Sequence, residues 1–350
     1  MKILNREITR ESAPYLIGEI GHNHQGDVKR AMSMMSTLLA AGFHAGKLQK
    51  RSNRAMFTSS LYNSPYSGHN SYGDTYGEHR EKLEFGKSDY KTLIEWGEEI
   101  GLHFFATAFD EEAADFLMDL AMPAFKIASG DIVNTPLLRK VANLGRPLFV
   151  STGGASLEDV KRAVDLILPL NPQLCILQCT ASYPCPPEGT GYDVFNLRVI
   201  QTYLKAFPDC VIGFSDHQSG IAFGPAAVAL GATVFEKHVT FDRAAKGTDH
   251  PFSLEPVGQK KYARDIQRTY EALNDGVKRR FDCENAPLRK MAKSIYASED
   301  IPHGAIITRS MLSLKTPADG LPPYLLESII GRKTKRFIGK EELITMEDLE

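Results

Sequence analysis

The chain has 350 residues and a mass of 38.8 kDa, which suggests two or three domains, although one α/β barrel alone takes about 250 residues. Hydrophobic residues make up 43% and charged residues 24%, a composition that excludes a disordered protein. The formal net charge of -2 provides no basic field for nucleic acid or for an anionic membrane. Any anionic substrate must therefore be held by a local cluster of cations.

Location can be predicted from apolar runs and cysteines. The sequence has no run of about 18 apolar residues, so we expect no membrane span. Its first residues lack the apolar core of a signal peptide. The five cysteines form an odd, irregularly spaced set, which argues against a disulfide framework. We expect a cytoplasmic protein.

In chain order, a short β-rich run followed by a polar turn and a helical pattern occurs eight times. The first helix should begin after Asp27, a good N-cap, and end at Gly42. Only the polar stretch Arg51–Lys87 lacks a clear period. The predicted strands are Tyr15–Gly21, Ala45–Gln49, His103–Thr107, Ala124–Ser129, Pro147–Thr152, Leu174–Thr180, Val211–His217 and Thr233–Thr240. Eight such units predict an α/β protein with a closed (β/α)₈ barrel, and an open doubly wound sheet is the alternative.

The alternation stops after Leu273. We therefore assign residues 1–275 to the barrel and the polar segment 276–290 to a linker. Residues 291–350 contain short strand-like runs separated by Pro and Gly, which predict a small α+β module. A module of this size is marginally stable alone, so we expect it to dock on something larger.

Every predicted strand ends in polar residues, and the active site of such a barrel lies at these strand ends. Burying a polar side chain costs a few kcal/mol unless it is paired, so packing alone is a poor explanation for eight polar ends. The candidate residues are Glu19, Lys47, Gln49, Thr107, Lys126, Ser129, Asp131, Ser151, Tyr183, Ser215, His217 and His238.

Two lysines stand inside these apolar strands. Lys47 and Lys126 would be joined in one barrel mouth by Ser129, Ser151 and Ser215. Ammonium groups and hydroxyls bind phosphate or carboxylate, so this set predicts an anion cradle. The alternative interpretation is that the lysines lie on the surface.

Two histidines end neighbouring strands. Neutral imidazole is a common ligand of transition metals, so His217 and His238 predict a catalytic divalent ion such as Mn²⁺. The alternative is a pair of hydrogen-bonded core histidines. His22 and His24 form a competing pair in a loop.

Nine motifs in the barrel region and the tail resemble the sialic acid synthase family, which includes spore coat polysaccharide biosynthesis protein E. The tail Ile295–Pro323 is similar to the antifreeze-like, or SAF, domain of that family. The barrel motifs, in family order, are GEIGHNHQGD, AGKLQK, FFATAFD, FKIASGD, LFVSTGG, LQCTASYP, GFSDH, FEKHVTFDR and KGTDH.

The resemblance implies a transferase of surface polysaccharide biosynthesis. Phosphoenolpyruvate would condense with an aldose, usually a 2-acetamido hexose, to give an α-keto acid sugar and phosphate. It also implies a divalent metal, Mn²⁺ or Mg²⁺, and a homodimer in which each SAF domain caps the partner's barrel.

The family also implies residue roles. His217 and His238 would bind the metal, and Glu19 and Asp131 are candidates for the acid or base. From the chemistry itself, both lysines would also stabilise the leaving phosphate where its charge develops. The phosphoenolpyruvate ligands would be Lys47, Thr107, Lys126, Ser129, Ser151 and Ser215, and the sugar ligands Glu19, Gln49, Tyr183 and Asp249.

Three features depart from the sialic acid synthase pattern. Thr316 stands where bacterial members typically carry Arg, Ala181 stands where some have Asn, and the Arg51–Lys87 loop with its TYGEHR sequence is unlike theirs. These departures leave the acceptor sugar open. Two other functions also stay open: an aldolase that forms a Schiff base through Lys126, and a carbohydrate-binding protein without catalysis.

Overall fold

The computed structural model describes residues 1–183, 185–186 and 188–350. The chain divides into two compact units, Met1–Asn274 and Asp275–Glu350. Each has its own apolar core. Within the described residues, no helix combines the length and apolar character that a membrane crossing requires.

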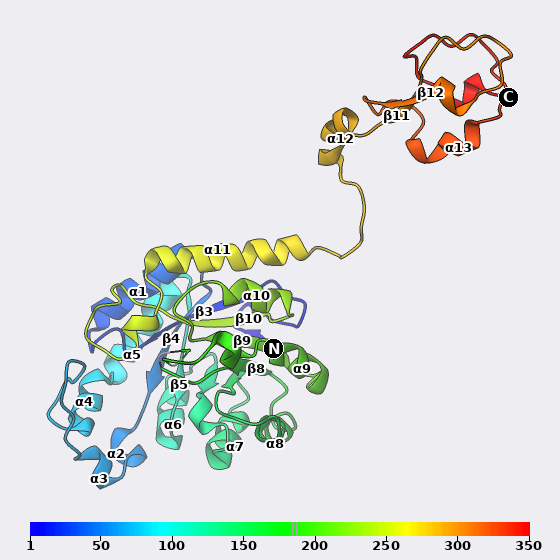
Figure 1. Ribbon diagram of the computed structural model, residues 1–350. Helices are drawn as coiled ribbons and strands as arrows, with labels where there is room; N and C mark the ends of the chain where they lie inside the picture. Colours follow the sequence, from blue (N-terminus) through cyan, green and yellow to red (C-terminus); the bar gives the residue numbers. More distant parts are fainter. Residues whose placement is uncertain (184, 187) are drawn as a thin grey trace. The chain divides into compact units, whose positions relative to one another are not determined.

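The first unit is built on eight parallel strands that close into a barrel (Figure 1). Closure is made by β10, which pairs with both β9 and β3. The strands are β3 (Tyr15–Gly21), β4 (Ala45–Lys50), β5 (His103–Ala108), β6 (Phe125–Ile127), β7 (Leu148–Ser151), β8 (Leu174–Cys179), β9 (Val211–Asp216) and β10 (Val234–His238). The prediction of a closed barrel is confirmed, and the open sheet is excluded.

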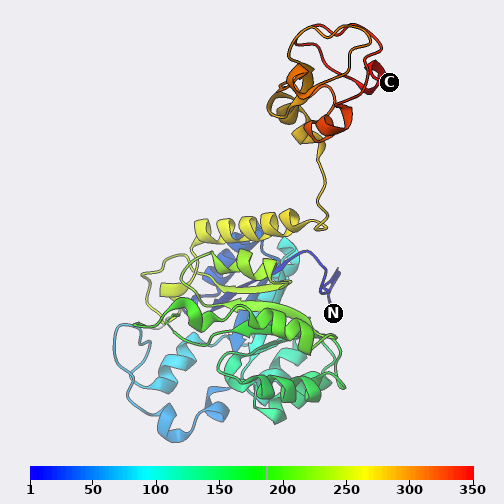
Figure 2. The same ribbon diagram turned by 45° about the vertical axis from the view of Figure 1, so that its right-hand side comes forward.

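Helices surround the barrel (Figures 1 and 2). As predicted, the first begins after Asp27, whose carboxylate accepts hydrogen bonds from the amides of Lys29 and Arg30, and ends at Gly42. Gly42 has a φ of 91°, which favours glycine at a helix end. The outer helices are α1 (Val28–Ala41), α5 (Lys87–Ile100), α6 (Glu111–Asp119), α7 (Thr135–Asn143), α8 (Leu157–Ile167), α9 (Val199–Ala206), α10 (Phe223–Ala229) and α11 (Pro256–Leu273).

The barrel interior has an apolar layer below a polar one. The rings of Phe105 on β5 and Phe149 on β7 stack across the interior, with centroids 5.4 Å apart. Thr107 and Ser151 follow these residues by two positions, so they lie on the same faces of their strands, nearer the C-terminal ends. The alternation of each strand thus sets a polar chamber above an apolar floor.

Two regions of the first unit contain elements that the sequence did not predict. A hairpin of β1 (Lys2–Ile3) and β2 (Arg6–Glu7) precedes the barrel. The polar stretch after β4 contains three short helices, α2 (Asn53–Met56), α3 (Ser59–Tyr62) and α4 (Tyr76–Leu83). Helices of four to eight residues are too short to show a helical period in the sequence.

The second unit packs around a small core that includes the buried Ile295, Ile329, Ile338 and Ile344. Its antiparallel pair is β11 (Ser294–Ala297) with β12 (Leu312–Lys315), and its helices are α12 (Asn285–Met291) and α13 (Leu326–Ile329). The segment expected as a linker therefore includes most of α12. The short 3₁₀ helices of the chain are Ser129–Asp131, Tyr192–Phe195, His250–Phe252, Asp282–Glu284, Arg309–Met311, Pro323–Leu325 and Met346–Asp348.

Candidate active site

A cavity of about 400 Å³ lies at the C-terminal ends of the barrel strands, and residues from all eight strands or the loops after them line it. Of the residues predicted to form the site, only Asp131 is not among those lining this cavity. The predicted residues that it brings together are Glu19, Lys47, Gln49, Thr107, Lys126, Ser129, Ser151, Tyr183, Ser215, His217, His238 and Asp249.

Two buried lysines face two buried carboxylates at the base of the cavity. The Lys47 ammonium forms an ion pair with Glu19 and donates a hydrogen bond to Thr107 Oγ1 at 2.7 Å. The Lys126 ammonium lies 3.1 Å from Glu236 Oε2. The residues of the predicted anion cradle therefore line one cavity, but its two lysines are already paired with carboxylates.

Glu236 was not assigned a role from the sequence. Strand alternation could have found it, because Glu236 precedes His238 by two residues and shares its face. Its Oε1 accepts hydrogen bonds from Lys126 at 3.1 Å and from Ser215 at 3.3 Å. This carboxylate thus organises both a predicted lysine and a predicted serine.

The two carboxylates differ in their tendency to hold a proton. Burial raises the pKa of Glu19, although Lys47 opposes the shift. Burial would raise the pKa of Glu236 too, but Lys126 and Lys47 outweigh it and lower that pKa to about 2. Glu236 is therefore a permanent anion near neutral pH, and Glu19 is the carboxyl group suited to exchanging a proton.

Two of the predicted serines, Ser129 and Ser151, differ in their hydrogen bonding. Ser129 Oγ accepts a hydrogen bond from the Gly153 amide at 3.0 Å. Ser151 Oγ is buried and has no hydrogen-bond partner within the described part of the chain. A buried hydroxyl without a partner is costly, so Ser151 is suited to binding a ligand group.

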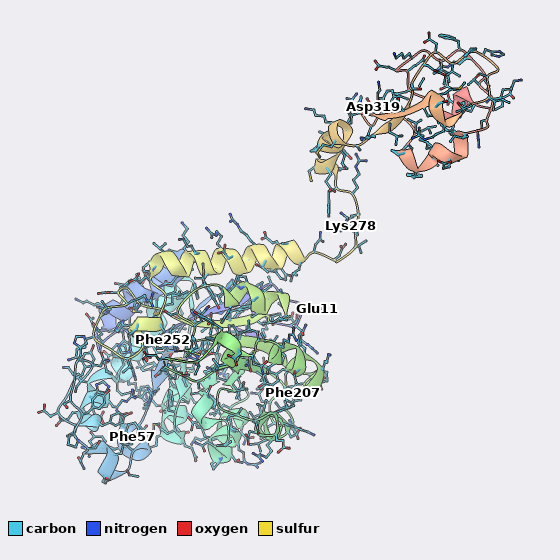
Figure 3. The ribbon with its side chains drawn as sticks, in the orientation of Figure 1. Glu11, Phe57, Phe207, Phe252, Lys278 and Asp319 are labelled. Carbon is cyan, nitrogen blue, oxygen red and sulfur yellow. The ribbon has the colours of Figure 1, made fainter. Side chains whose placement is uncertain are left out.

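The rings of His217 and His238 lie side by side, with centroids 5.3 Å apart. His217 Nδ1 is 3.2 Å from the Thr180 carbonyl, to which it can donate, and Nε2 is 3.3 Å from the Tyr183 hydroxyl. Burial lowers the pKa of both imidazoles to about 3, so both are neutral. Phe252, labelled in Figure 3, packs with its ring edge-on against both.

This pair fits a divalent metal. His238 Nδ1 is buried without a hydrogen-bond partner among the described residues, and it lies 3.7 Å from Asp249 Oδ2. In the described ranges, no group of three or more His, Cys, Asp and Glu is arranged to hold a metal. Two histidines would leave the remaining coordination positions to water or substrate, and a catalytic metal site keeps at least one position open.

The competing pair of histidines is arranged differently. His24 Nδ1 accepts a hydrogen bond from the Gly26 amide at 3.0 Å, and its ring stacks on Phe85. His22 lies between the guanidinium groups of Arg51 and Arg80. Neighbouring cations disfavour a metal ion, so the surroundings of this pair suit a metal less well than those of His217 and His238.

Asp131 and Glu19 were the two candidates for the acid or base. Asp131 ends the short 3₁₀ helix after β6, and its carboxylate accepts a hydrogen bond from Asn134 at 3.0 Å. Glu19 lies in the cavity, where its Oε1 accepts a hydrogen bond from Gln49 at 2.7 Å. The geometry therefore favours Glu19.

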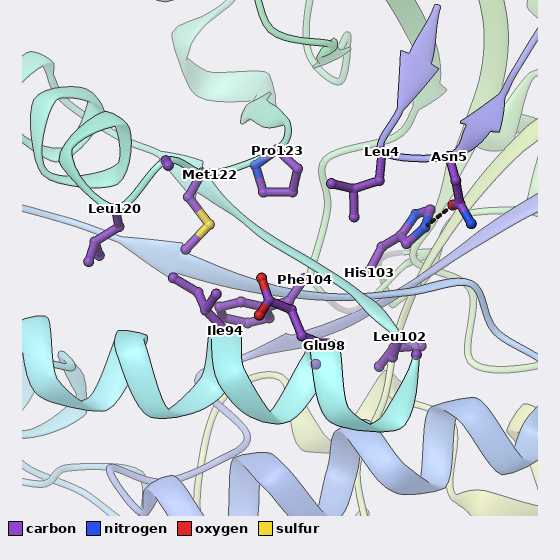
Figure 4. A pocket seen from close by; sticks show the side chains of 13 residues that line it. Leu4, Asn5, Ile94, Glu98, Leu102, His103, Phe104, Leu120, Met122 and Pro123 are labelled. Carbon is purple, nitrogen blue, oxygen red and sulfur yellow. Dashed lines mark hydrogen bonds between the residues drawn. The ribbon is translucent and has the colours of Figure 1, made fainter.

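A second cavity, of about 390 Å³, contains none of the predicted site residues (Figure 4). Leu4, Ile94, Phe104 and Met122 give it a largely apolar lining. His103, which also lines it, begins β5, whereas Thr107 of the polar cavity lies near the end of the same strand. The two cavities thus belong to opposite ends of the barrel.

Comparison with known proteins gives two family matches. The NeuB family model matches residues 34–278, and the SAF domain model matches residues 292–350. The chain belongs to the NeuB family. The resemblance to sialic acid synthases and the presence of a SAF domain are thereby confirmed.

Relatives of this NeuB chain align over nearly its whole length. N-acetylneuraminate-9-phosphate synthase of Mus musculus is 41% identical over 96% of this chain and 92% of its own. N,N'-diacetyllegionaminic acid synthase of Campylobacter jejuni is 32% identical over 94% of this chain and 98% of its own. The crystal structure of spore coat polysaccharide biosynthesis protein SpsE of Bacillus subtilis matches with a TM-score of 0.66 and 30% identity, covering 100% of this chain and 99% of that one.

Proposed function

We propose that this protein condenses phosphoenolpyruvate with an aldose, an N-acetylated hexose, to give a sialic-acid-like α-keto acid sugar and phosphate. The observation that carries the proposal is the union of two buried lysines and two neutral histidines in one cavity. Two of its relatives are named as synthases of N-acetylneuraminate 9-phosphate and of N,N'-diacetyllegionaminic acid. These names support a sialic-acid-like product. The pathway that we propose is the synthesis of a surface polysaccharide.

Phosphoenolpyruvate would bind at the base of the cavity. Its phosphate and carboxylate would accept hydrogen bonds from Lys47 and Lys126. In this structure these lysines form ion pairs with Glu19 and Glu236. Ser151 would donate its unused hydroxyl, and Thr107, Ser129 and Ser215 would complete the site. Lys126 would then stabilise the charge that develops on the departing phosphate.

The acceptor sugar would lie above it, toward Gln49, Tyr183 and Asp249. His217 and His238 would hold a divalent metal, Mn²⁺ or Mg²⁺, which when bound supplies a Lewis acid for the aldehyde oxygen of the open-chain sugar. We expect the residues of the cavity wall, rather than the buried cluster, to position that sugar.

The chemistry balances with one water molecule. C3 of phosphoenolpyruvate attacks the aldehyde carbon, which forms the new carbon–carbon bond and leaves C2 electron-poor. Water adds to C2, and the resulting tetrahedral intermediate expels phosphate to give the keto group. Glu19, whose pKa burial raises, would accept the proton of that water. The alkoxide that the attack leaves on the former aldehyde oxygen takes up one proton to become the new hydroxyl group.

A measurement of phosphoenolpyruvate consumption tests the proposal. With Mn²⁺ present, the protein should consume phosphoenolpyruvate only when a suitable acceptor is added from a panel of hexoses, N-acetylhexosamines, diacetamido hexoses, pentoses and their phosphates. Metal removal by chelation should abolish turnover, and added Mn²⁺ should restore it. Folded, metal-loaded protein that consumes nothing with any acceptor would refute the proposal, and sugar affinity without turnover would indicate a binding protein.

A second candidate function is a Schiff-base aldolase. Burial lowers the pKa of Lys126, which favours the uncharged amine that forms an imine. Its ion pair with Glu236 acts in the opposite direction. Borohydride reduction in the presence of pyruvate separates the two functions, because the condensation proposed above forms no covalent adduct.

The homodimer and the cytoplasmic location also stay predictions. A dimer in which each SAF domain caps the partner's barrel should elute and scatter light at about twice the chain mass of 38.8 kDa. A species of only 38.8 kDa at micromolar concentration would contradict it.

A further inference from the structure

Two arginines that the proposed chemistry does not use meet at the edge of the polar cavity. Arg51 follows β4, and Arg80 belongs to α4 of the unpredicted insertion. Both line the cavity, and His22 lies between them. The Arg51 Nη1 atom is 3.1 Å from His22 Nε2, and the Arg80 Nη1 atom is 3.3 Å from His22 Nδ1.

This arrangement has more donors than acceptors. Burial and both arginines lower the pKa of His22 well below its ordinary value, so the ring is neutral. A neutral imidazole has only one acceptor nitrogen, and its other nitrogen carries hydrogen. One of the two guanidinium groups therefore points an N–H at a ring atom that cannot accept it.

Carboxylates do not neutralise the two guanidinium groups. Glu84 Oε1 is 4.0 Å from Arg51 Nη1, but Glu84 is also bound by Lys50 at 3.2 Å. Arg80 forms no ion pair within the described ranges of the chain. Asp249 is the other acidic residue at this side of the cavity. The edge of the cavity thus keeps an excess of positive charge.

Both guanidinium groups are held in place. Arg51 lies over the Phe109 ring at 3.6 Å and donates to Gln49 Oε1 at 2.7 Å. Arg80 donates from Nε and Nη2 to the Tyr76 hydroxyl at 3.0 and 2.8 Å. Fixed planar forks of this kind bind phosphate with little loss of side-chain entropy.

Gln49 connects this edge to the buried cluster. Its amide nitrogen donates to Glu19 while its oxygen accepts from Arg51, both at 2.7 Å. The lysine pair and the arginine pair are therefore separate cationic sites on one cavity, a single side chain apart. The lysine pair suits phosphoenolpyruvate. The condensation proposed above supplies no second anion for the arginine pair.

We infer that Arg51 and Arg80, with His22, form a second anion subsite that binds a phosphate monoester at the end of the acceptor sugar remote from its aldehyde. This inference rests on the proposed function and specifies its substrate class. The acceptor is then a phosphorylated N-acetylated hexose, bound between the two subsites. The same subsite would retain the phosphate of the product, since that group takes no part in the reaction.

The test compares N-acetylhexosamines with their 6-phosphates as acceptors, by phosphoenolpyruvate consumption. We expect the wild-type protein to prefer the 6-phosphate by about 10- to 100-fold in kcat/KM, the range of a charged hydrogen-bonding pair. Arg80→Met should lower that preference to within a few-fold, and Arg80→Lys should retain part of it. Arg54→Met is the matched control, because Arg54 belongs to the same insertion and lies over the Tyr62 ring outside the cavity.

A binding measurement keeps the test independent of turnover. Calorimetric titration of the hexosamine 6-phosphate into chelator-treated protein, with phosphoenolpyruvate saturating, should show binding that Arg80→Met weakens and Arg54→Met does not. Equal use of free and phosphorylated sugars by the wild type would overturn the inference but leave the condensation standing. A rise in the KM of phosphoenolpyruvate for Arg80→Met, with an unchanged sugar preference, would assign the arginines to the other substrate and also overturn it.

Discussion

Two buried lysine–carboxylate pairs on neighbouring positions of β10 have opposite surroundings. Lys126 and Glu236 lie 3.1 Å apart and line the cavity. Lys237 and Asp216 also lie 3.1 Å apart, but both side chains are 0% exposed and neither lines the cavity. Because side chains alternate along a strand, Glu236 faces the barrel interior and Lys237 faces away from it.

The difference lies in what else each pair contacts. The Lys237 ammonium also donates to the Gln218 carbonyl and lies 5.9 Å from the Tyr262 ring of α11. Asp216 Oδ1 accepts from the Gln218 amide at 2.8 Å. The Lys237–Asp216 pair is enclosed by protein and links β9 to β10. The cavity pair borders space that a ligand can fill, so a substrate can exchange partners with it.

Removing the lysine of the cavity pair should have the largest effect on activity. Lys126→Met should lower kcat/KM for phosphoenolpyruvate by about 10³-fold, at the upper end of the range for one preorganised electrostatic donor. Phosphoenolpyruvate consumption measures the effect, and thermal unfolding of the variant serves as the control for folding. Activity within tenfold of the wild type would show that the pair is structural after all.

Removing the lysine of the closed pair should instead act on stability. Lys237→Met leaves Asp216 buried without its partner, which should cost about 3–5 kcal/mol in the free energy of unfolding. The double variant Lys237→Met with Asp216→Leu should recover much of that loss, because the uncompensated charge is gone. Denaturant titration measures both variants. If Lys237→Met left stability unchanged and abolished turnover, the contrast between the two pairs would be wrong.

His24 is a buried group outside the cavity, and it should make the stability of the protein depend on pH. Burial lowers the pKa of His24 to about 3, against an ordinary value of 6.5. The unfolded chain therefore binds a proton below pH 6.5 that the folded protein refuses until about pH 3. Stability should fall as the pH falls through this window, by up to about 1.4 kcal/mol per pH unit for this group. Denaturant titrations of the wild type and His24→Asn between pH 7 and pH 4 should show a shallower slope for the variant.

Periodicity was sufficient to predict the barrel and the strand ends. It placed Lys47, Lys126, His217 and His238 correctly in one chamber, because strand alternation and parallel order fix which side chains share a face. It could not show that both lysines are already paired. Such pairing depends on distances across the barrel interior, which no local pattern in the sequence contains.

A related reason explains why the sequence did not predict some residues of the site. Arg80 belongs to α4, whose eight residues begin at a capping box of Thr75 and Glu78 rather than with a clear apolar stripe. The TYGEHR sequence departs from the sialic acid synthase pattern, but nothing in it indicates that its arginine returns to the cavity. Asp131 shows the converse, since it follows a site strand yet does not line the cavity.

The smallest expected effect concerns two buried serine hydroxyls, Ser151 in the cavity and Ser253 outside it. We expect the first to act in ligand binding and the second in stability. Ser151→Ala removes a buried hydroxyl without a partner in the described residues, so stability should change by no more than about 0.5 kcal/mol, while the KM of phosphoenolpyruvate rises up to about tenfold. Ser253 is the matched control, because its Oγ accepts from Asn23 at 3.0 Å and donates to the Asp249 carbonyl at 2.6 Å. Ser253→Ala should cost about 1–3 kcal/mol of stability by leaving both groups unpaired. If Ser151→Ala destabilised the fold as Ser253→Ala does, then Ser151 would belong to the scaffold and the base of the cavity would lose its one uncommitted hydroxyl among the described serines.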